Sequence, residues 1–317
     1  MPSIYLHDHR DFTDLLRILS DEMQIAAPLI EKDYWIMHAL YGLTQLGLEF
    51  ELKGETSLSK GFDIIDRFSE DIDIHIKPPV EMGVNEDPGK GKPKIVEGRK
   101  KYYDYLAEII KIEGFTGVER DPAFDDTRYY RSGGIRLIYE SKVELVPGLK
   151  DGILLEAGFD QITPNLKTTI SSWAYEKAKK AGVDIIDNRA LSISCYHPGY
   201  TFVEKLQTIA TKFRQEQEDT IARPNLMRQY YDIYCLLENE DVKKFIGTEA
   251  YLKHKDRWFP KVDAEVPLIN NEAFLLKDPV LRSGFKERYQ ATAALYYHGQ
   301  PEFEEVLARI HKFLPNF

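Results

Sequence analysis

Residues 71–76 read "DIDIHI", and this alternation of acid and isoleucine constrains the fold more than any other feature of the chain. Successive side chains of a strand point to opposite faces, so Asp71 and Asp73 share one face and the isoleucines share the other. Two carboxylates on one face of a buried-type strand repel each other and lose hydration, which a divalent cation with oxygen ligands would compensate. A solvated edge strand with two incidental acids is the alternative interpretation.

A second feature stands upstream, where residues 53–60 read "KGETSLSK". A strand that ends in Gly54 and leads into a helix N-terminus would present backbone amides that suit a phosphate, and Ser57 adds a hydroxyl donor. Metal-binding carboxylates beside a phosphate-binding turn are the apparatus for phosphoryl transfer from a nucleoside triphosphate. Together the two features favour a catalytic site over the edge-strand interpretation.

The remaining patterns predict two differently built parts. Period-2 segments and turn signals predict strands in the first part, at 48–53, 71–77, 133–140 and 152–159. Helical periodicity predicts helices there at 12–23, 28–47 and 97–112, with a loop at 77–94, and further helices at 168–181, 200–218, 225–238, 241–254, 280–297 and 301–313. The predicted class is therefore α+β: a domain over 1–167 with a mixed β-sheet flanked by helices, then a helical domain over 168–317.

Composition excludes several classes of protein. The 317 residues contain no apolar run of 18 or more and no basic-then-apolar N-terminus, so neither a membrane span nor a secretory signal is expected. Cys195 and Cys235 lack CxxC spacing and are expected as buried thiols in a reducing cytoplasm. The formal net charge of −10 argues against coating nucleic acid by charge alone, although a local basic region is compatible with it.

The glycine, the serine and an aspartate pair that begins 14 residues after that serine resemble the polymerase-β-type nucleotidyltransferase superfamily. More narrowly, "LKGETSLSK" and "RFSEDIDI" resemble the AbiEii/AbiGii toxin family, which includes the MenT-like toxins. Three further stretches resemble other motifs of that family in the same order: "EKDYW" (31–35), "TFVEKLQTIATKFR" (201–214) and "RQYYDIYCLL" (228–237). The resemblance covers most of the chain, from about residue 28 to residue 240.

The resemblance implies roles for the N-terminal motifs. It assigns nucleotide binding to Gly54, Thr56 and Ser57, and metal binding with catalysis to Asp71 and Asp73. The expected cofactor is Mg²⁺, as two ions that Mn²⁺ can replace. This chain departs from the family pattern at residue 55, where a glutamate stands in place of the usual second glycine and would repel a triphosphate unless it points away.

The superfamily also implies a third metal carboxylate. Glu156 interrupts the apolar run of "GILLEAGFD" (152–160), so an acid there needs a reason, and it is the favoured residue. Glu144 is the competitor, but its neighbours alternate charged and apolar residues as in a half-exposed strand.

The later motifs receive catalytic roles from the same resemblance. Lys205 matches the family lysine that contacts the triphosphate, and Asp232 matches the essential aspartate of the last motif. On a helix Lys205 would lie beside an apolar stripe, able to reach a cleft between the domains, and Asp232 could hold it through an ion pair. An ordinary surface lysine is the alternative from the residues alone. Gln229 stands where many relatives carry a second acid.

The function implied is transfer of a nucleotidyl group from an NTP to an acceptor, with RNA, and the 3′ end of tRNA in particular, expected. The protein would be the toxin half of a toxin–antitoxin or abortive-infection pair, with a cognate antitoxin as a possible partner and the cytoplasm as its location. Two alternatives stay open: a non-catalytic nucleotide-binding or interaction protein on the same fold, and transfer to a small-molecule or protein hydroxyl.

Three weaker signals complete the analysis. The basic residues of 90–101, Arg99 among them, could contact an RNA backbone, although a solvated loop is favoured. His75 shares the face of the aspartates and is expected in solvent at a strand end. Arg67 is expected to shape the turn before the aspartates or to pair with a carboxylate.

Overall fold

The computed structural model divides into two compact units, each described here on its own. The first contains Met1–Phe62 and Phe68–Tyr196, and the second contains Asp63–Arg67 and His197–Phe317. The predicted boundary at 167/168 falls inside a strand that spans Asn165–Ile170. Residues 165–196 add two strands and a helix to the first unit. The structure describes residues 3–69, 71–144, 149–160, 162–223 and 225–317.

Within those residues the first unit is built on a mixed sheet with strand order β3-β4-β5-β2-β1-β7-β6. The β2–β5 and β1–β7 pairs are parallel and the other neighbours are antiparallel. The strands are β1 (Phe50–Lys53), β2 (Asp71–Ile76), β3 (Phe115–Arg120), β4 (Ser132–Tyr139), β5 (Ile153–Gly158), β6 (Asn165–Ile170) and β7 (Ala190–Tyr196). The four predicted strands are confirmed as β1, β2, β4 and β5, whereas β3, β6 and β7 were not predicted.

The two faces of the central strands differ in polarity. On one face the isoleucines of β2 are fully buried, in register with apolar residues of β1 and β5. Two helices cover this face. Tyr103 of α4 (Pro93–Ile109) contacts Gly133 of β4 there. Trp35 of α2 (Ala27–Gln45) stacks on Tyr139 of the same strand. The opposite face carries the two aspartates.

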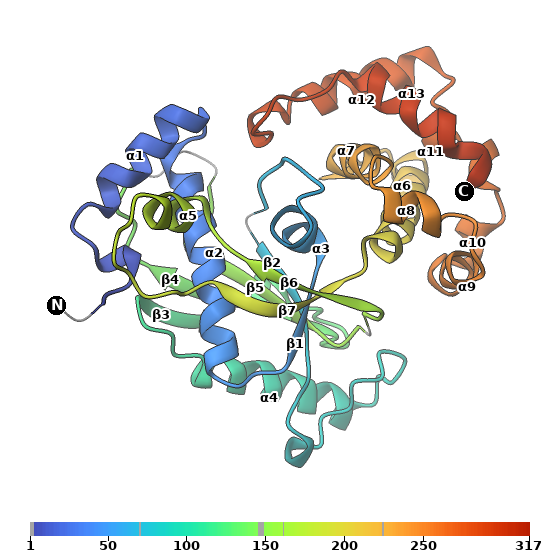
Figure 1. The fold of residues 1–317 in the computed structure, drawn as a ribbon. Coiled ribbons are helices and arrows are strands. Elements are labelled where there is room, and N and C mark those ends of the chain that lie inside the picture. The colour runs from blue at the N-terminus through green and yellow to red at the C-terminus, as the bar shows by residue number, and fades with distance from the viewer. Residues whose placement is uncertain (1–2, 70, 145–148, 161, 224) are drawn as a thin grey trace. The chain divides into compact units, whose positions relative to one another are not determined.

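Other helices of the first unit pack around α2 rather than on the acidic face. α1 (Phe12–Met23) and α5 (Trp173–Lys180) pack on α2 and on each other, as Figure 1 also shows. The predicted helix at 168–181 was therefore wrong in its first residues, which belong to β6. Between β1 and β2 the chain forms α3 (Gly54–Thr56), which continues into a π-helical turn over Ser57–Gly61.

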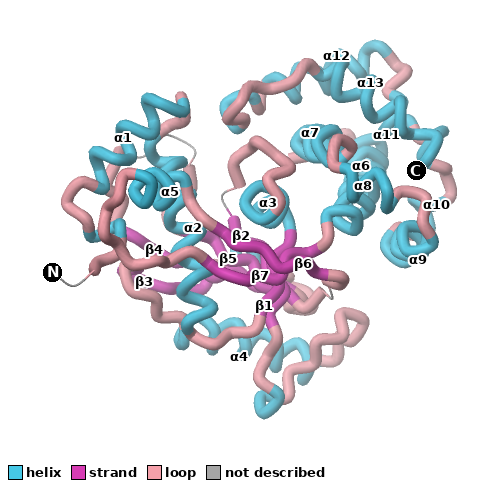
Figure 2. Tube along the Cα trace, viewed as in Figure 1, coloured by secondary structure: helices cyan, strands magenta, loops and turns pink. Residues whose placement is uncertain are grey.

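The second unit is helical in the described residues, apart from a short bridge between Arg67 and Tyr296 (Figure 2). Its longest helix, α6 (Pro198–Asp219), packs on α7 (Leu226–Leu236), α8 (Glu240–Phe245) and α9 (Glu249–Trp258). The remaining α-helices are α10 (Lys261–Ala264), α11 (Glu272–Leu275), α12 (Pro279–Gln290) and α13 (Phe303–Phe313). The single helix predicted over 241–254 is two helices, because Gly247 takes a positive φ of 79° between them.

None of the helices in the described ranges combines the length and the apolar character needed to cross a membrane.

Candidate active site

The turn after β1 depends on a glycine. Gly54 has a φ of +69°, a conformation that L side chains rarely adopt. A Cβ at this position would lie 2.2 Å from Oδ2 of Asp73, so the Asp73 carboxyl packs directly on the glycine backbone. The two motifs that the sequence analysis linked are therefore in contact.

The two hydroxyl residues of the turn are buried and bonded within the protein. The Ser57 hydroxyl donates to the Gly54 carbonyl at 2.9 Å, and the Thr56 hydroxyl lies 2.5 Å from the Asp71 carbonyl. Both side chains fix the turn against β2. A hydroxyl bond from either of them to a phosphate stays a prediction, and it would require that hydroxyl to change partner.

A buried ion pair ties the same turn to α2. Asp33 is almost fully buried, and its carboxylate lies 2.5 Å from Nζ of Lys60. Asp33 also accepts the backbone N–H of Trp173 at 2.9 Å. The sequence motif "EKDYW" therefore contributes a structural anchor for the turn, which spacing alone did not reveal.

Three carboxylates lie on the polar face of the central strands. Asp71 and Asp73 share this face of β2, and Glu156 of β5 is in direct register with Asp73. Parallel neighbours in register present their side chains on the same side of the sheet. On the other side of β2, the residue of β1 that pairs with Asp73 is Lys53.

The electrostatics of this face oppose ionisation of the acids. Burial, followed by the charges of Glu55 and Glu156, raises the pKa of the Asp73 carboxyl to about 8. The pKa of Glu156 is raised too, first by burial and then by Asp71, against the opposing charge of Lys150. Lys150 lies 3.4 Å from Oδ2 of Asp71. The lysines present do not offset the burial and mutual repulsion of these acids.

This environment fits a divalent cation by charge and by donor type. Carboxylate oxygens are the ligands that Mg²⁺ prefers, and a bound cation would reverse the cost of ionising Asp73. Within the described ranges no three His, Cys, Asp or Glu side chains already converge as a metal site. The fit therefore lies in the chemistry of the donor set and not in a preformed coordination geometry.

Two further glutamates are distinguished by their positions. The negative charge of Glu55 contributes to the raised pKa of Asp73, an effect that the sequence could not show. Glu144, the competitor for the third carboxylate, is exposed in the segment after β4. Of the two predicted positions for the third carboxylate, only Glu156 lies in register with the aspartates.

In the second unit, Asp232 forms the centre of a buried ion-pair cluster. Its carboxylate accepts Nε and Nη2 of Arg67 at 2.6 and 2.7 Å, and it lies 2.6 Å from Nζ of Lys205. Lys205 also donates to Oε1 of Gln229 at 3.0 Å. The predicted Lys205–Asp232 ion pair is confirmed, and Lys205 is a buried residue rather than an ordinary surface lysine.

Arg67 pairs with a carboxylate, which is one of the two roles that the sequence predicted for it. The segment before the aspartates belongs to the second unit, where the Asp66 N–H donates to the Tyr231 hydroxyl and its carbonyl accepts the Tyr297 N–H. The sequence indicated a turn or a carboxylate partner for Arg67, but not which carboxylate. Its partner lies 165 residues away, which no local pattern could indicate.

Arg99 has a structural role and is not exposed for RNA. It is fully buried and donates to the backbone carbonyls of Asn85 and Tyr129 at 2.8 and 3.0 Å. Its neighbours Lys100 and Lys101 are exposed on α4. Arg99 is therefore not available to contact an RNA backbone, which was the weaker interpretation of this stretch.

The aspartate pair on a mixed sheet, with Asp73 packed on a glycine turn, agrees with the nucleotidyltransferase class that the sequence motifs resemble. The fold is similar to that of MenT4, a nucleotidyltransferase toxin from Mycobacterium tuberculosis H37Rv, with a TM-score of 0.57. That likeness covers 95% of this chain and 90% of that chain at 17% sequence identity. A comparison with curated proteins finds no match.

The family model described as the nucleotidyl transferase AbiEii toxin of type IV toxin–antitoxin systems matches residues 35–309. This match spans most of the chain, so the protein belongs to the AbiEii nucleotidyltransferase toxin family. The resemblance stated from the sequence is thereby confirmed, together with the α+β fold class and the nucleotidyltransferase enzyme class.

Proposed function

We propose that the protein transfers a nucleoside monophosphate from an NTP to the 3′-hydroxyl of an RNA, with tRNA as the expected acceptor. The observation that carries the proposal is the Asp73 carboxyl, which packs on Gly54, faces Glu156 and has a raised pKa. Such a buried, mutually repelling set of acids is costly without a cation, and it is typical of a functional site.

Asp71, Asp73 and Glu156 are the residues that we assign to hold Mg²⁺. When bound, the ions would supply charge neutralisation for the phosphates and orient the reacting oxygens. The acceptor hydroxyl oxygen forms a bond to the α-phosphorus while the bond to the pyrophosphate oxygen breaks. Pyrophosphate leaves, and the proton of the acceptor hydroxyl passes to solvent water.

The protein's other groups bind and orient. The backbone amides at the start of α3 suit a phosphate, because a helix N-terminus presents donors to anions. Lys205 is assigned to the triphosphate as a cationic contact, with its ammonium oriented by Asp232.

The finer features rest on the family. Membership of a toxin–antitoxin family supports a cognate antitoxin partner. We propose the RNA acceptor and a cytoplasmic location, where NTPs and tRNA are present, on the resemblance of the motifs to that family. Transfer to a small-molecule or protein hydroxyl would use the same chemistry and differ only in the acceptor.

The test is incubation of the protein with each α-labelled NTP, Mg²⁺ and total RNA, followed by separation of RNA, protein and small products. We expect label on RNA in the tRNA size range, dependent on Mg²⁺ and absent with Asp71→Ala. Label on protein or on a small product would replace the RNA acceptor. No transfer to any acceptor, with NTP still bound, would support a non-catalytic binding protein.

A further inference from the structure

His75 lies in a setting that the sequence did not predict. It was expected in solvent at a strand end, but only 6% of its side chain is exposed. Its Nδ1 lies 2.7 Å from Oε2 of Glu51, the residue directly opposite on β1. Because an ionised carboxylate can only accept, Nδ1 carries the proton of this hydrogen bond. Glu51 is held in turn by Nδ2 of Asn165 at 2.8 Å.

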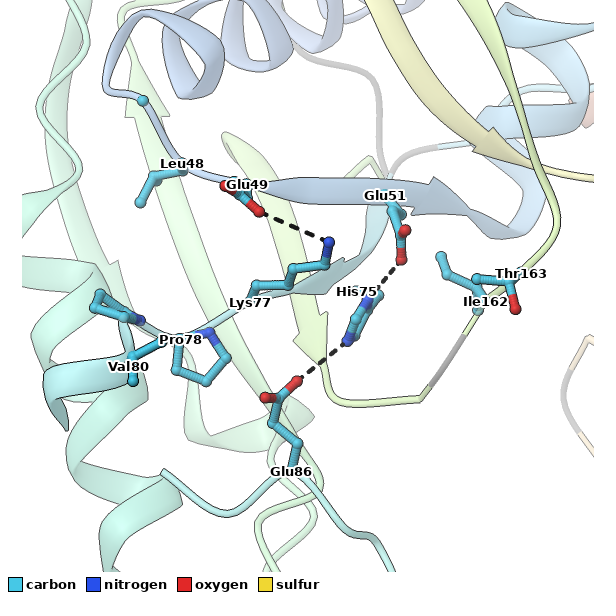
Figure 3. Close-up of a pocket in the computed structure, with 12 residues that line it drawn as sticks. Leu48, Glu49, Glu51, His75, Lys77, Pro78, Val80, Glu86, Ile162 and Thr163 are labelled. Atoms are coloured by element: carbon cyan, nitrogen blue, oxygen red, sulfur yellow. Dashed lines mark hydrogen bonds and ion pairs between the residues drawn. The ribbon is translucent and has the colours of Figure 1, made fainter. Parts of the chain in front are cut away.

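The second ring nitrogen has no hydrogen-bond partner. Nε2 of His75 is buried, and the nearest charged group is Oε2 of Glu86, at 3.6 Å (Figure 3). A buried ring nitrogen without a hydrogen-bond partner costs free energy, so Nε2 is oriented for a polar group of a ligand.

A pocket of about 710 Å³ opens beside this nitrogen. Its described lining includes three glutamates, Glu49, Glu51 and Glu86, against a single lysine, Lys77. Lys77 lies toward Glu49, with 3.7 Å between Nζ and Oε2. Leaving His75 aside, the acidic and basic lining residues sum to −2, since three negative charges meet one positive charge.

The walls of the pocket are aliphatic. Pro78, Val80 and Ile162 line it beside the carboxylates (Figure 3). Phosphates and RNA backbones would be repelled by this lining. A cationic head with several N–H donors on an aliphatic chain matches it, because the head can pair with Glu86 beside Nε2 of His75 while the chain contacts the walls.

We propose that this pocket binds an alkylguanidinium or alkylammonium group, held between His75 and Glu86. The group can belong to a free small molecule or to a basic side chain of a polypeptide, since both carry the same chemistry. The site is independent of the nucleotidyl-transfer proposal and requires neither metal nor NTP.

The test is calorimetric titration of the purified protein with butylguanidine and with butylurea, its neutral isostere. Butylguanidine should bind in the millimolar range or tighter, and butylurea should bind at least about tenfold more weakly, since the charged hydrogen bonds are lost. The ¹⁵N resonance of His75 Nε2 should shift on addition of butylguanidine. If acetyl-arginine methylamide binds about tenfold more tightly than butylguanidine, the natural ligand group belongs to a polypeptide. If the two bind equally, it belongs to a small molecule.

Glu86→Gln should weaken butylguanidine binding by about tenfold. Glu86 is half exposed, so this variant should fold, and its melting temperature verifies that. Glu81→Gln is the matched control, because Glu81 is exposed on the same loop but outside the pocket, and binding should be unchanged. Three results would each overturn the proposal. They are no binding of butylguanidine, equally tight binding of butylguanidine and butylurea, and butylguanidine binding in Glu86→Gln as tight as in the wild type.

Discussion

On the sheet of the first unit, Asp73 faces Glu156 and shares its strand face with Asp71, and the pKa of Asp73 is raised. In the second unit, Asp232 is more deeply buried, yet Arg67 binds it with two hydrogen bonds and Lys205 pairs with it. Both regions bury acids. The first brings acids together, whereas the second surrounds one acid with cations.

The difference shows what each region lacks. The ion-pair cluster around Asp232 holds its own counter-charges, so it should be stable without any ligand. The acidic face of β2 and β5 keeps its acids close at the expense of their ionisation, which a bound cation would relieve. Removing an acid should therefore have opposite effects on stability in the two regions.

The largest expected effect on stability is at Asp232. Asp232→Asn leaves Arg67 and Lys205 buried without their carboxylate, and it should lower the free energy of unfolding by about 3–5 kcal/mol. Urea denaturation monitored by circular dichroism measures this. Lys205→Ala should cost less, because the Arg67–Asp232 pair stays intact. Asp241→Asn, at an exposed acid of α8, is the control and should change the free energy of unfolding little. If Asp232→Asn lost as little as this control, the cluster would not be needed for stability.

Next in size is the loss of catalysis at the acidic face. Asp73→Ala or Asp71→Ala should reduce nucleotidyl transfer by roughly 10²–10³-fold or more, the loss typical of removing one electrostatic contributor in an active site. Folding should be retained, because a repelling acid is removed. Initial rates with labelled NTP measure the effect, and Asp21→Ala, at an exposed acid of α1, controls for surface charge. Wild-type rates in either aspartate variant would contradict the assignment.

The pH dependence of stability sharpens the contrast. Folded Asp73 has a pKa of about 8, above its ordinary value, so the folded state binds more protons than the unfolded state between these values. Stability without Mg²⁺ should therefore fall as the pH rises toward 8. Asp73→Asn removes this dependence and should be more stable than the wild type above that pH by about 1–3 kcal/mol. Parallel stability curves for the two proteins would refute the raised pKa.

The smallest effect concerns the glutamates near the turn. Glu55→Gln removes a charge that raises the pKa of Asp73, so the pH dependence of unfolding should flatten, with a change under about 1 kcal/mol at any one pH. Glu144→Gln should leave that dependence as in the wild type, since Glu144 is exposed and lies off the acidic face. The free energy of unfolding of both variants is measured by denaturation across a pH series. If the two variants behaved alike, Glu55 would have no effect on the pKa of Asp73.

The sequence predicted the acidic face well, because alternation along a strand is a local signal. β1, β2, β4 and β5 followed from period-2 patterns and flanking turns. The strands that were missed lie outside the centre of the sheet, and β6 is an edge strand with Leu166 partly exposed, so its pattern is weak. The helix predicted at 168 took in part of β6 for that reason.

Contacts between distant residues could not be predicted in the same way. The Lys205–Asp232 pair followed from family motifs on two adjacent helices. The contribution of Arg67 requires the fold, since it depends on residues 63–67 belonging to the second unit. The approach of His75 to Glu86 likewise requires the fold, since Glu86 lies in the loop that follows β2.

The central claim is that the acidic face of the first unit is completed by a cation. Calorimetric titration of the apo protein with Mg²⁺, in parallel with Asp73→Ala and the control Asp21→Ala, tests it most directly. We predict Mg²⁺ binding to the wild type and the control, weakened by at least about tenfold in Asp73→Ala. Equal Mg²⁺ binding by all three proteins, or no binding by the wild type, would contradict the account.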